Sequence, residues 1–164
     1  MTVVLVMGVS GCGKTTIGRA LADRLGWQFL EGDALHPVAN VAKMAGGTPL
    51  SDEDRTPWLQ AIAAAMRAWD KDGKSGVVAC SALKRTYRDV LLRDLFSARL
   101  VYLDGDRATI SDRLTARKGH FMPPALLASQ FSVLEQPLAD ERPIVVPIAK
   151  SPEVILAELV AGLS

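Results

Sequence analysis

Short apolar runs alternate along this chain with longer segments of mixed polarity. The apolar runs are rich in β-branched residues and show no polar alternation, which is typical of strands buried on both faces of a sheet. They predict five strands, over residues 3–7, 27–30, 77–80, 100–103 and 143–148.

The segments between these runs place apolar residues at helical spacing. Ser51 and Asp54 form a capping signal for a long helix, and Pro37 and Pro152 suit helix starts. On the long helix, Trp58, Ile62, Met66 and Trp69 recur at spacings that indicate a core-facing stripe. The predicted helices cover residues 17–25, 37–45, a stretch from 51 onward, 85–95, 107–117, 125–135 and 152–162.

Strands that alternate with helices pair in parallel through right-handed crossovers. The sequence therefore predicts an α/β fold of three layers, with about five parallel strands in one domain spanning residues 1–164. Ligands bind such sheets beyond the carboxyl ends of the strands. Gly8, Asp33, Ser81 and Asp104 all follow predicted strands, so we expect them to line one rim.

Composition narrows the class of protein. The chain has 164 residues, 49% of them apolar, and a formal net charge of +1, which is ordinary for one globular domain. The balanced charge gives no reason to expect nucleic acid as a partner. The N-terminus lacks the basic region of a signal peptide, no apolar run is long enough for a membrane span, and two isolated cysteines suggest no disulfide framework. We expect a cytoplasmic protein without a membrane partner.

Residues 8–15 read Gly-Val-Ser-Gly-Cys-Gly-Lys-Thr and match the phosphate-binding P-loop, G-x-x-x-x-G-K-[ST]. An apolar strand precedes them and an amphipathic helix follows, which is the context that this motif requires. Lys14 would reach the β- and γ-phosphates of ATP, and Thr15 would offer its hydroxyl to Mg²⁺. The predicted nucleotide-binding set is Gly8, Val9, Ser10, Gly11, Cys12, Gly13, Lys14, Thr15 and Thr16.

Asp33 follows the second predicted strand on the ligand rim. A carboxylate there could orient an acceptor hydroxyl and take its proton, or hold Mg²⁺; the alternative is an ordinary turn aspartate. The third strand carries no aspartate for the metal, so Asp33 is the natural substitute and Asp104 a weaker one. His36 lies three residues beyond Asp33 and could hydrogen-bond the acceptor.

Two basic pairs are spaced four residues apart. Lys84 and Arg88 could bind an acidic acceptor, although a solvated basic face explains the same spacing. Arg113 and Arg117 could close over ATP and stabilise charge on the γ-phosphoryl group, although an exposed charged helix is again the alternative. Gly119 and the Pro123-Pro124 pair suit the hinges of a lid over about residues 113–135.

Several segments together resemble the small gluconate kinases of the P-loop, shikimate-kinase-like group. The resemblance covers nearly the whole chain. It implies transfer of the γ-phosphoryl group of ATP to the 6-hydroxyl of D-gluconate, giving 6-phosphogluconate and ADP, by a homodimer. The catalytic residues would be Lys14, Asp33 and Arg117, and the acceptor would meet Asp33, His36, Lys84, Arg88 and His120. The segments that carry it are residues 7–15, 31–37, 40, 43–44, 47–59, 80–85, 87–89, 117–121 and 130–131.

Other functions remain open at this stage. A shikimate kinase has paired aspartates after the second strand and a glycine triplet after the third, where this chain reads Glu31-Gly32-Asp33 and Ser81-Ala82-Leu83. A nucleoside monophosphate kinase would need a base-binding segment that the sequence does not offer. A nucleotide-switched regulatory module would lose ATP slowly, whatever sugar acid is present.

Overall fold

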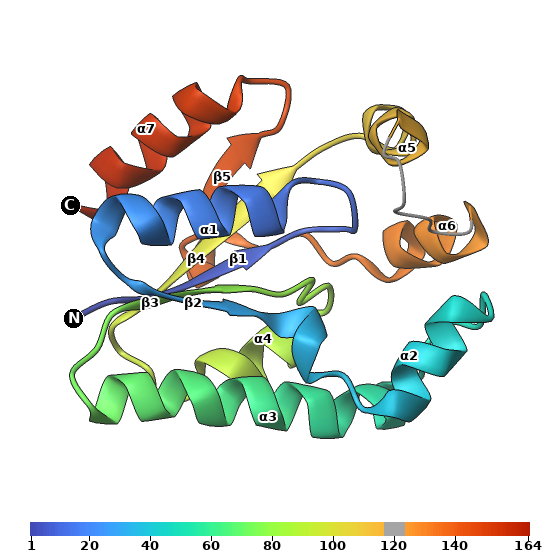
Figure 1. Ribbon diagram of the computed structural model, residues 1–164, viewed down its shortest axis with the longest axis horizontal. Coiled ribbons are helices and arrows are strands. Elements are labelled where there is room, and N and C mark those ends of the chain that lie inside the picture. Colours follow the sequence, from blue (N-terminus) through green and yellow to red (C-terminus); the bar gives the residue numbers. More distant parts are fainter. Residues whose placement is uncertain (117–123) are drawn as a thin grey trace.

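The apolar runs form one parallel sheet (Figure 1). The computed structural model describes residues 1–116 and 124–164, and in these ranges five strands pair in the order β2-β3-β1-β4-β5. The central β1 pairs with β3 and β4, with Val3 opposite both Gly76 and Ala98. The predicted parallel sheet is confirmed, with strands β1 (Val3–Met7), β2 (Gln28–Glu31), β3 (Gly76–Ala79), β4 (Ala98–Asp104) and β5 (Ile144–Pro147).

Helices cover both faces of the sheet, which gives the predicted three layers (Figure 1). Helices α1 (Lys14–Leu25) and α7 (Pro152–Leu163) lie on one face, and α3 (Asp52–Lys71) and α4 (Arg85–Leu92) lie on the other. Alternate residues of β1 point to opposite faces, so Val4 packs with the α1 side and Leu5 with the α3 side. Each face therefore has its own apolar core.

Local signals set the helix boundaries. The Ser51 hydroxyl accepts a hydrogen bond from the Asp54 N–H, and the Asp54 carboxylate accepts one from the Ser51 N–H, which is the capping box that the sequence predicts. Trp58, Ile62 and Met66 are buried along α3, as their spacing indicated. Pro37 is the N-cap of α2 (Val38–Ala45), the helix that precedes α3, whereas the sequence predicted it as the first helical residue.

Three further helices gather at the end of the sheet where the strands terminate (Figure 1). They are α2 (Val38–Ala45), α5 (Arg107–Ala116) and α6 (Pro124–Val133). The predicted lid segment ends in α6, while residues 117–123 lie outside the described ranges. Two short 3-10 turns, η1 (Gly32–Leu35) and η2 (Ala139–Glu141), were not predicted, because such turns have no hydrophobic period of their own.

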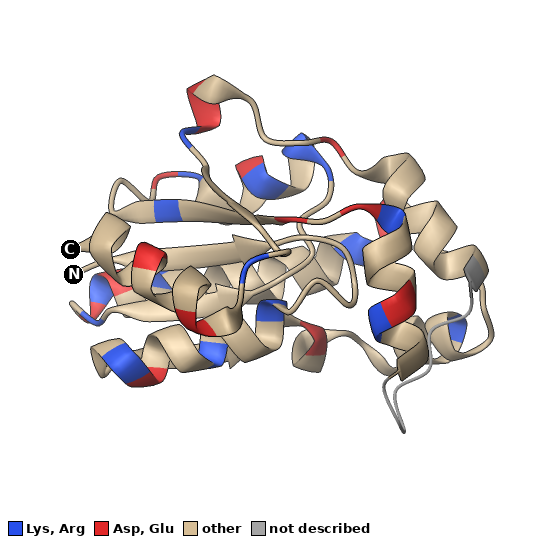
Figure 2. Cartoon of the chain, turned by 90° about the horizontal axis from the view of Figure 1, so that it is seen from above, with Lys and Arg blue, Asp and Glu red and all other residues tan. Residues whose placement is uncertain are grey.

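Charged residues of both signs are spread over the helices and loops (Figure 2). Within the ranges that the structure covers, no helix combines the length and the apolar character that crossing a membrane would take.

Candidate active site

The phosphate loop, residues 8–15, turns from the end of β1 into the start of α1. Gly8 has a φ of 151° and Gly13 a φ of 97°, angles that favour glycine. A Cβ atom at Gly8 would lie 2.6 Å from Cys12 Sγ and 3.0 Å from the Leu103 carbonyl oxygen. The glycine at position 8 is therefore required by both its backbone angle and its close contacts.

Two polar side chains of the loop are held by neighbouring groups. The Lys14 ammonium donates to the Val9 carbonyl oxygen at 3.0 Å, which folds it back over the loop. The Thr15 hydroxyl donates to Glu31 Oε2, and Glu31 Oε1 accepts the Asp33 N–H at 3.3 Å. One carboxylate thus joins the phosphate loop to the turn that carries Asp33.

Glu31 is a candidate that sequence reasoning missed. It is the last residue of β2, so the strand-end rule that selected Asp33 applies to it as well. Carboxylate and hydroxyl oxygens are ligands that Mg²⁺ prefers. The contact between Glu31 and Thr15 therefore provides a pair of suitable oxygen donors beside the phosphate loop.

A cleft of about 330 Å³ opens next to the loop. It brings together residues that follow β1, β2 and β3, as the strand-end rule predicted for Ser81 and Asp33, and α2, α3 and α6 close its sides. The lining residues are Ser10, Lys14, Asp33, His36, Val41, Met44, Pro49, Leu50, Arg55, Trp58, Ser81, Leu83, Leu126, Ser129 and Gln130.

His36 stands in this cleft with its ring stacked on Trp58. The ring centroids are 4.0 Å apart with an interplanar angle of 15°, and the Trp58 indole N–H donates to the Gly32 carbonyl oxygen at 2.7 Å. Burial lowers the pKa of His36; the charge of Asp33 acts in the opposite direction and that of Arg55 adds to the lowering. The imidazole is therefore held in a fixed plane and favours its neutral form.

Arg55 was also missed by sequence reasoning. Its Nη1 donates to the Leu50 carbonyl oxygen at 2.7 Å and to the Tyr87 hydroxyl at 3.1 Å, which anchors one edge of the guanidinium. Among the described residues that line the cleft, Lys14 and Arg55 are the cationic side chains. One signal for Arg55 was available, because it lies in the first turns of α3 and within the 47–59 segment of the family resemblance.

The described part of the predicted lid segment contacts the phosphate loop through Gln130 of α6. The Ser10 N–H donates to Gln130 Oε1 at 2.8 Å, and Gln130 Nε2 donates to Ser10 Oγ at 3.0 Å. A single amide thus joins two segments that are 120 residues apart in the sequence.

A second hollow, also of about 330 Å³, is lined by residues 11–13 of the phosphate loop. Arg113 lies in it and donates from Nη2 to the Ile148 carbonyl oxygen at 2.8 Å. Thr16 lines it too, so both of these predicted nucleotide-binding residues are beside the loop. The other lining residues include Ile17, Ala116, Lys150, Pro152 and Ile155, which the sequence did not single out.

Lys84 and Arg88 do not come together as an acceptor site. Lys84 pairs with Asp52 at 3.0 Å and lies outside the cleft lining. Arg88 is 1% exposed and forms an ion pair with Glu141, with its Nε 2.7 Å from Oε1. Their spacing of four residues was read as a shared face, but Lys84 is the N-cap of α4, while Arg88 points inward to η2. Of the other predicted residues, Arg117 and His120 lie outside the described ranges.

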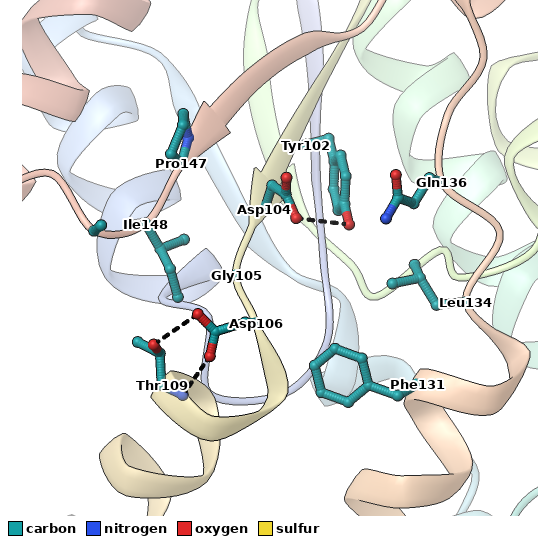
Figure 3. Close-up of a pocket in the computed structure, with 11 residues that line it drawn as sticks. Tyr102, Asp104, Gly105, Asp106, Thr109, Phe131, Leu134, Gln136, Pro147 and Ile148 are labelled. Atoms are coloured by element: carbon teal, nitrogen blue, oxygen red, sulfur yellow. Dashed lines mark hydrogen bonds between the residues drawn. The ribbon is translucent and has the colours of Figure 1, made fainter.

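A larger cavity, of about 570 Å³, lies where β4 and β5 end (Figure 3). Asp104 faces this cavity and accepts a hydrogen bond from the Tyr102 hydroxyl at 3.3 Å, instead of joining Asp33 and Ser81 in the cleft. Burial, together with the charge of Asp104, raises the pKa of Tyr102 to about 12. Asp106 caps α5 by accepting the Thr109 N–H at 2.8 Å. Asp104 therefore lies at the carboxyl edge of the parallel sheet, as expected, but it lines a different cavity from Asp33.

Comparisons with known proteins agree with this arrangement. A family model described as shikimate kinase matches residues 10–153. A gluconokinase of Gluconobacter oxydans is 51% identical over 157 residues, which cover 96% of this chain and 88% of that enzyme. The thermosensitive gluconokinase of Escherichia coli is 50% identical over 141 residues, covering 86% of this chain and 75% of that enzyme. The crystal structure of a gluconokinase from Sinorhizobium meliloti superposes with a TM-score of 0.90 at 43% identity, covering 99% of this chain and 91% of that one. The chain therefore belongs to the gluconokinases within the shikimate kinase family.

Proposed function

We propose that this protein transfers the γ-phosphoryl group of ATP to the 6-hydroxyl of D-gluconate, producing 6-phospho-D-gluconate and ADP in the catabolism of sugar acids. The observation that carries the proposal is that the phosphate loop lines the same cleft as Asp33, His36 and Arg55. The identity with gluconokinases over nearly the whole chain supports this choice of acceptor.

The nucleotide would lie across the phosphate loop. Its base would enter the hollow lined by Thr16 and Arg113, and its phosphates would take the N–H groups of residues 8–16 and the N-terminal end of α1. The γ-phosphoryl group would then face the cleft. Lys14, which lines the cleft, would exchange its bond to the Val9 carbonyl for the phosphate oxygens.

The residues beside the loop fit Mg²⁺. The Thr15 hydroxyl and the Glu31 carboxylate supply hard oxygen donors already in contact, and Asp33 adds a second carboxylate on the same turn. Bound Mg²⁺ would neutralise charge on the phosphates. We propose Thr15 and Glu31 as its nearest protein groups, with Asp33 acting through water.

The acceptor would occupy the cleft with its carboxylate toward Arg55. Arg55 is already anchored on one edge by Leu50 and Tyr87, so its remaining N–H groups can bind an anion without reorganisation. The hydroxyl to be phosphorylated would lie between Asp33 and the γ-phosphoryl group. Arg55 takes over the role of carboxylate partner that the sequence suggested for Lys84 and Arg88.

In the reaction, the acceptor oxygen attacks the γ-phosphorus in line with the departing ADP oxygen. Asp33 accepts the hydroxyl proton, and Lys14 stabilises the charge that develops on the phosphoryl oxygens. Arg117 is proposed from the sequence for the same electrostatic role, and His120 for a contact with the acceptor.

An ATP-consumption assay across a panel of acceptors tests the proposal. We expect D-gluconate to accelerate ADP formation strongly, and ³¹P NMR to show a phosphomonoester on the terminal carbon. Shikimate, other sugar acids and nucleoside monophosphates form the comparison panel. Equal rates with and without gluconate would refute the proposed acceptor, and faster turnover with shikimate would reassign it.

We also propose a cytoplasmic homodimer, which is the assembly implied by the family resemblance. Analytical ultracentrifugation of the purified chain tests this, since a single species at the monomer mass would contradict it.

A further inference from the structure

Asn40 is a buried polar side chain. It lies on α2 and is 3% exposed, so its amide needs hydrogen-bond partners inside the protein. Asn40 Nδ2 lies 2.8 Å from the Asp54 carbonyl oxygen and 3.2 Å from His36 Nδ1. The same amide nitrogen therefore faces one backbone group and one side chain of the cleft.

The first contact fixes which way the amide faces. A backbone carbonyl oxygen can only accept a hydrogen bond, so the Asn40 atom that faces Asp54 must be the NH₂ group. That nitrogen has no lone pair to offer, and it can only donate its second hydrogen to His36 Nδ1. Nδ1 must therefore be unprotonated. A neutral imidazole has one ring proton, which places that proton on Nε2.

The surroundings of the ring hold this state in place. The stack on Trp58 fixes the plane of the imidazole, and the indole is itself tied to Gly32. With Nδ1 occupied by Asn40, Nε2 is the ring nitrogen left to face a ligand in the cleft that His36 lines. Protonation of Nδ1 would set an N–H against the amide NH₂, which disfavours the imidazolium form.

We propose that Asn40 is a positioning residue that fixes His36 as the tautomer protonated on Nε2, so that His36 donates to an acceptor oxygen and cannot remove its proton. This inference rests on the proposed function for its ligand. Asp33 and His36 then have different roles toward the acceptor. Asp33 can only accept a proton, and His36 can only donate a hydrogen bond. A hydroxyl satisfies both groups at once, which favours an alcohol in this position.

The tautomer can be measured without substrate. The chain has two histidines, so the His36→Gln variant identifies the His36 signals in a two-bond ¹⁵N–¹H correlation spectrum of the whole protein. At pH 7.5 we expect His36 Nδ1 to resonate as an unprotonated nitrogen and Nε2 as a protonated one. A protonated Nδ1, or averaged shifts from both tautomers, would overturn the proposal.

Paired variants test the consequence for the reaction. Gln places its amide nitrogen near the position of Nε2, and Asn places it near Nδ1, so His36→Gln should keep more activity than His36→Asn. Loss of the single hydrogen bond should lower kcat/KM for gluconate about tenfold in His36→Asn, with the KM for ATP little changed. Equal activity of the two variants would overturn the donor role.

Asn40→Asp tests the positioning residue itself. Its carboxylate cannot donate to Nδ1, so we expect Nδ1 to become protonated and kcat/KM for gluconate to fall about tenfold, with circular dichroism unchanged. An unprotonated Nδ1 in a folded Asn40→Asp protein would overturn the role of Asn40, and if this variant does not fold, the wild-type spectrum decides. A wild-type enzyme that ignores gluconate would refute the proposed function, while the spectrum would still report the tautomer.

Discussion

Replacing Arg88 by alanine distinguishes a structural role from an acceptor-binding role. The guanidinium donates from Nε and Nη2 to the two Glu141 carboxylate oxygens, and from Nη1 to the carbonyl oxygens of Ala82 and Leu83 at 2.9 and 3.2 Å. The Arg88 and Glu141 side chains are only 1% and 8% exposed. Truncation would therefore leave a carboxylate and two carbonyl groups without their partner in a place that water reaches poorly.

The size of the effect follows from that burial. Breaking a buried ion pair on one side costs about 3–5 kcal/mol of unfolding free energy. For a chain of this length, such a loss corresponds to a fall in Tm of roughly 6–20 °C. Replacing both partners by apolar residues, as Arg88→Met with Glu141→Leu, removes the stranded charge and should recover much of the loss.

Urea unfolding and thermal melts of these variants provide the measurement. Arg85→Ala is the matched control. Arg85 lies on the same helix as Arg88 but forms an exposed pair with Asp140 of η2, so its loss should cause a much smaller change in stability. We expect the KM for gluconate to stay within about twofold of wild type in folded Arg88→Ala. Unchanged stability together with a selective rise in that KM would show that Arg88 binds the acceptor and that the structural reasoning is wrong.

Three further predictions concern the loop, the cleft and the α3 cap. Lys14→Ala should lower kcat about 10²- to 10³-fold in steady-state assays while circular dichroism stays unchanged. Arg55→Ala should lower kcat/KM for gluconate about ten- to a hundredfold and leave the KM for ATP unchanged; the reverse pattern would exclude Arg55 from the acceptor site. Hydrogen bonds from Lys43 and the Ser51 N–H lower the pKa of Asp54 from 3.8 to about 2. Its contribution to stability is thus complete above about pH 4 and lost as the pH falls through 2, so urea unfolding should show the difference from Asp54→Asn vanishing over that range.

Much of the fold could be predicted because its signals are local. A strand buried on both faces reads as an apolar run, and the phosphate loop needs glycines at fixed positions, as the angles at Gly8 and Gly13 confirm. The capping box at Ser51 is likewise a matter of four neighbouring residues. The residues that signal each of these features are neighbours in the sequence, although the strands then pair with strands that are distant in it.

The site was harder to predict because its contacts are distant in the sequence. Arg88 finds Glu141 53 residues away, and a spacing of four residues on a helix says nothing about what lies opposite. In the sequence, Arg55 could not be distinguished from the other charged residues in the first turns of this helix. Tertiary packing places its side chain in the lining of the cleft. The strand-end rule found Asp33 but could not say that Glu31 would be the carboxylate that contacts Thr15.

The Ser10–Gln130 contact has a thermodynamic consequence for ligand affinity. Gln130 Oε1 already occupies the Ser10 N–H, which is one of the donors that an incoming phosphate oxygen could use. Any anion that takes this hydrogen must displace the amide, so its measured dissociation constant includes the free energy of breaking the Ser10–Gln130 contact. By reciprocity, a change that strengthens the Ser10–Gln130 contact lowers the affinity for such an anion by the same factor.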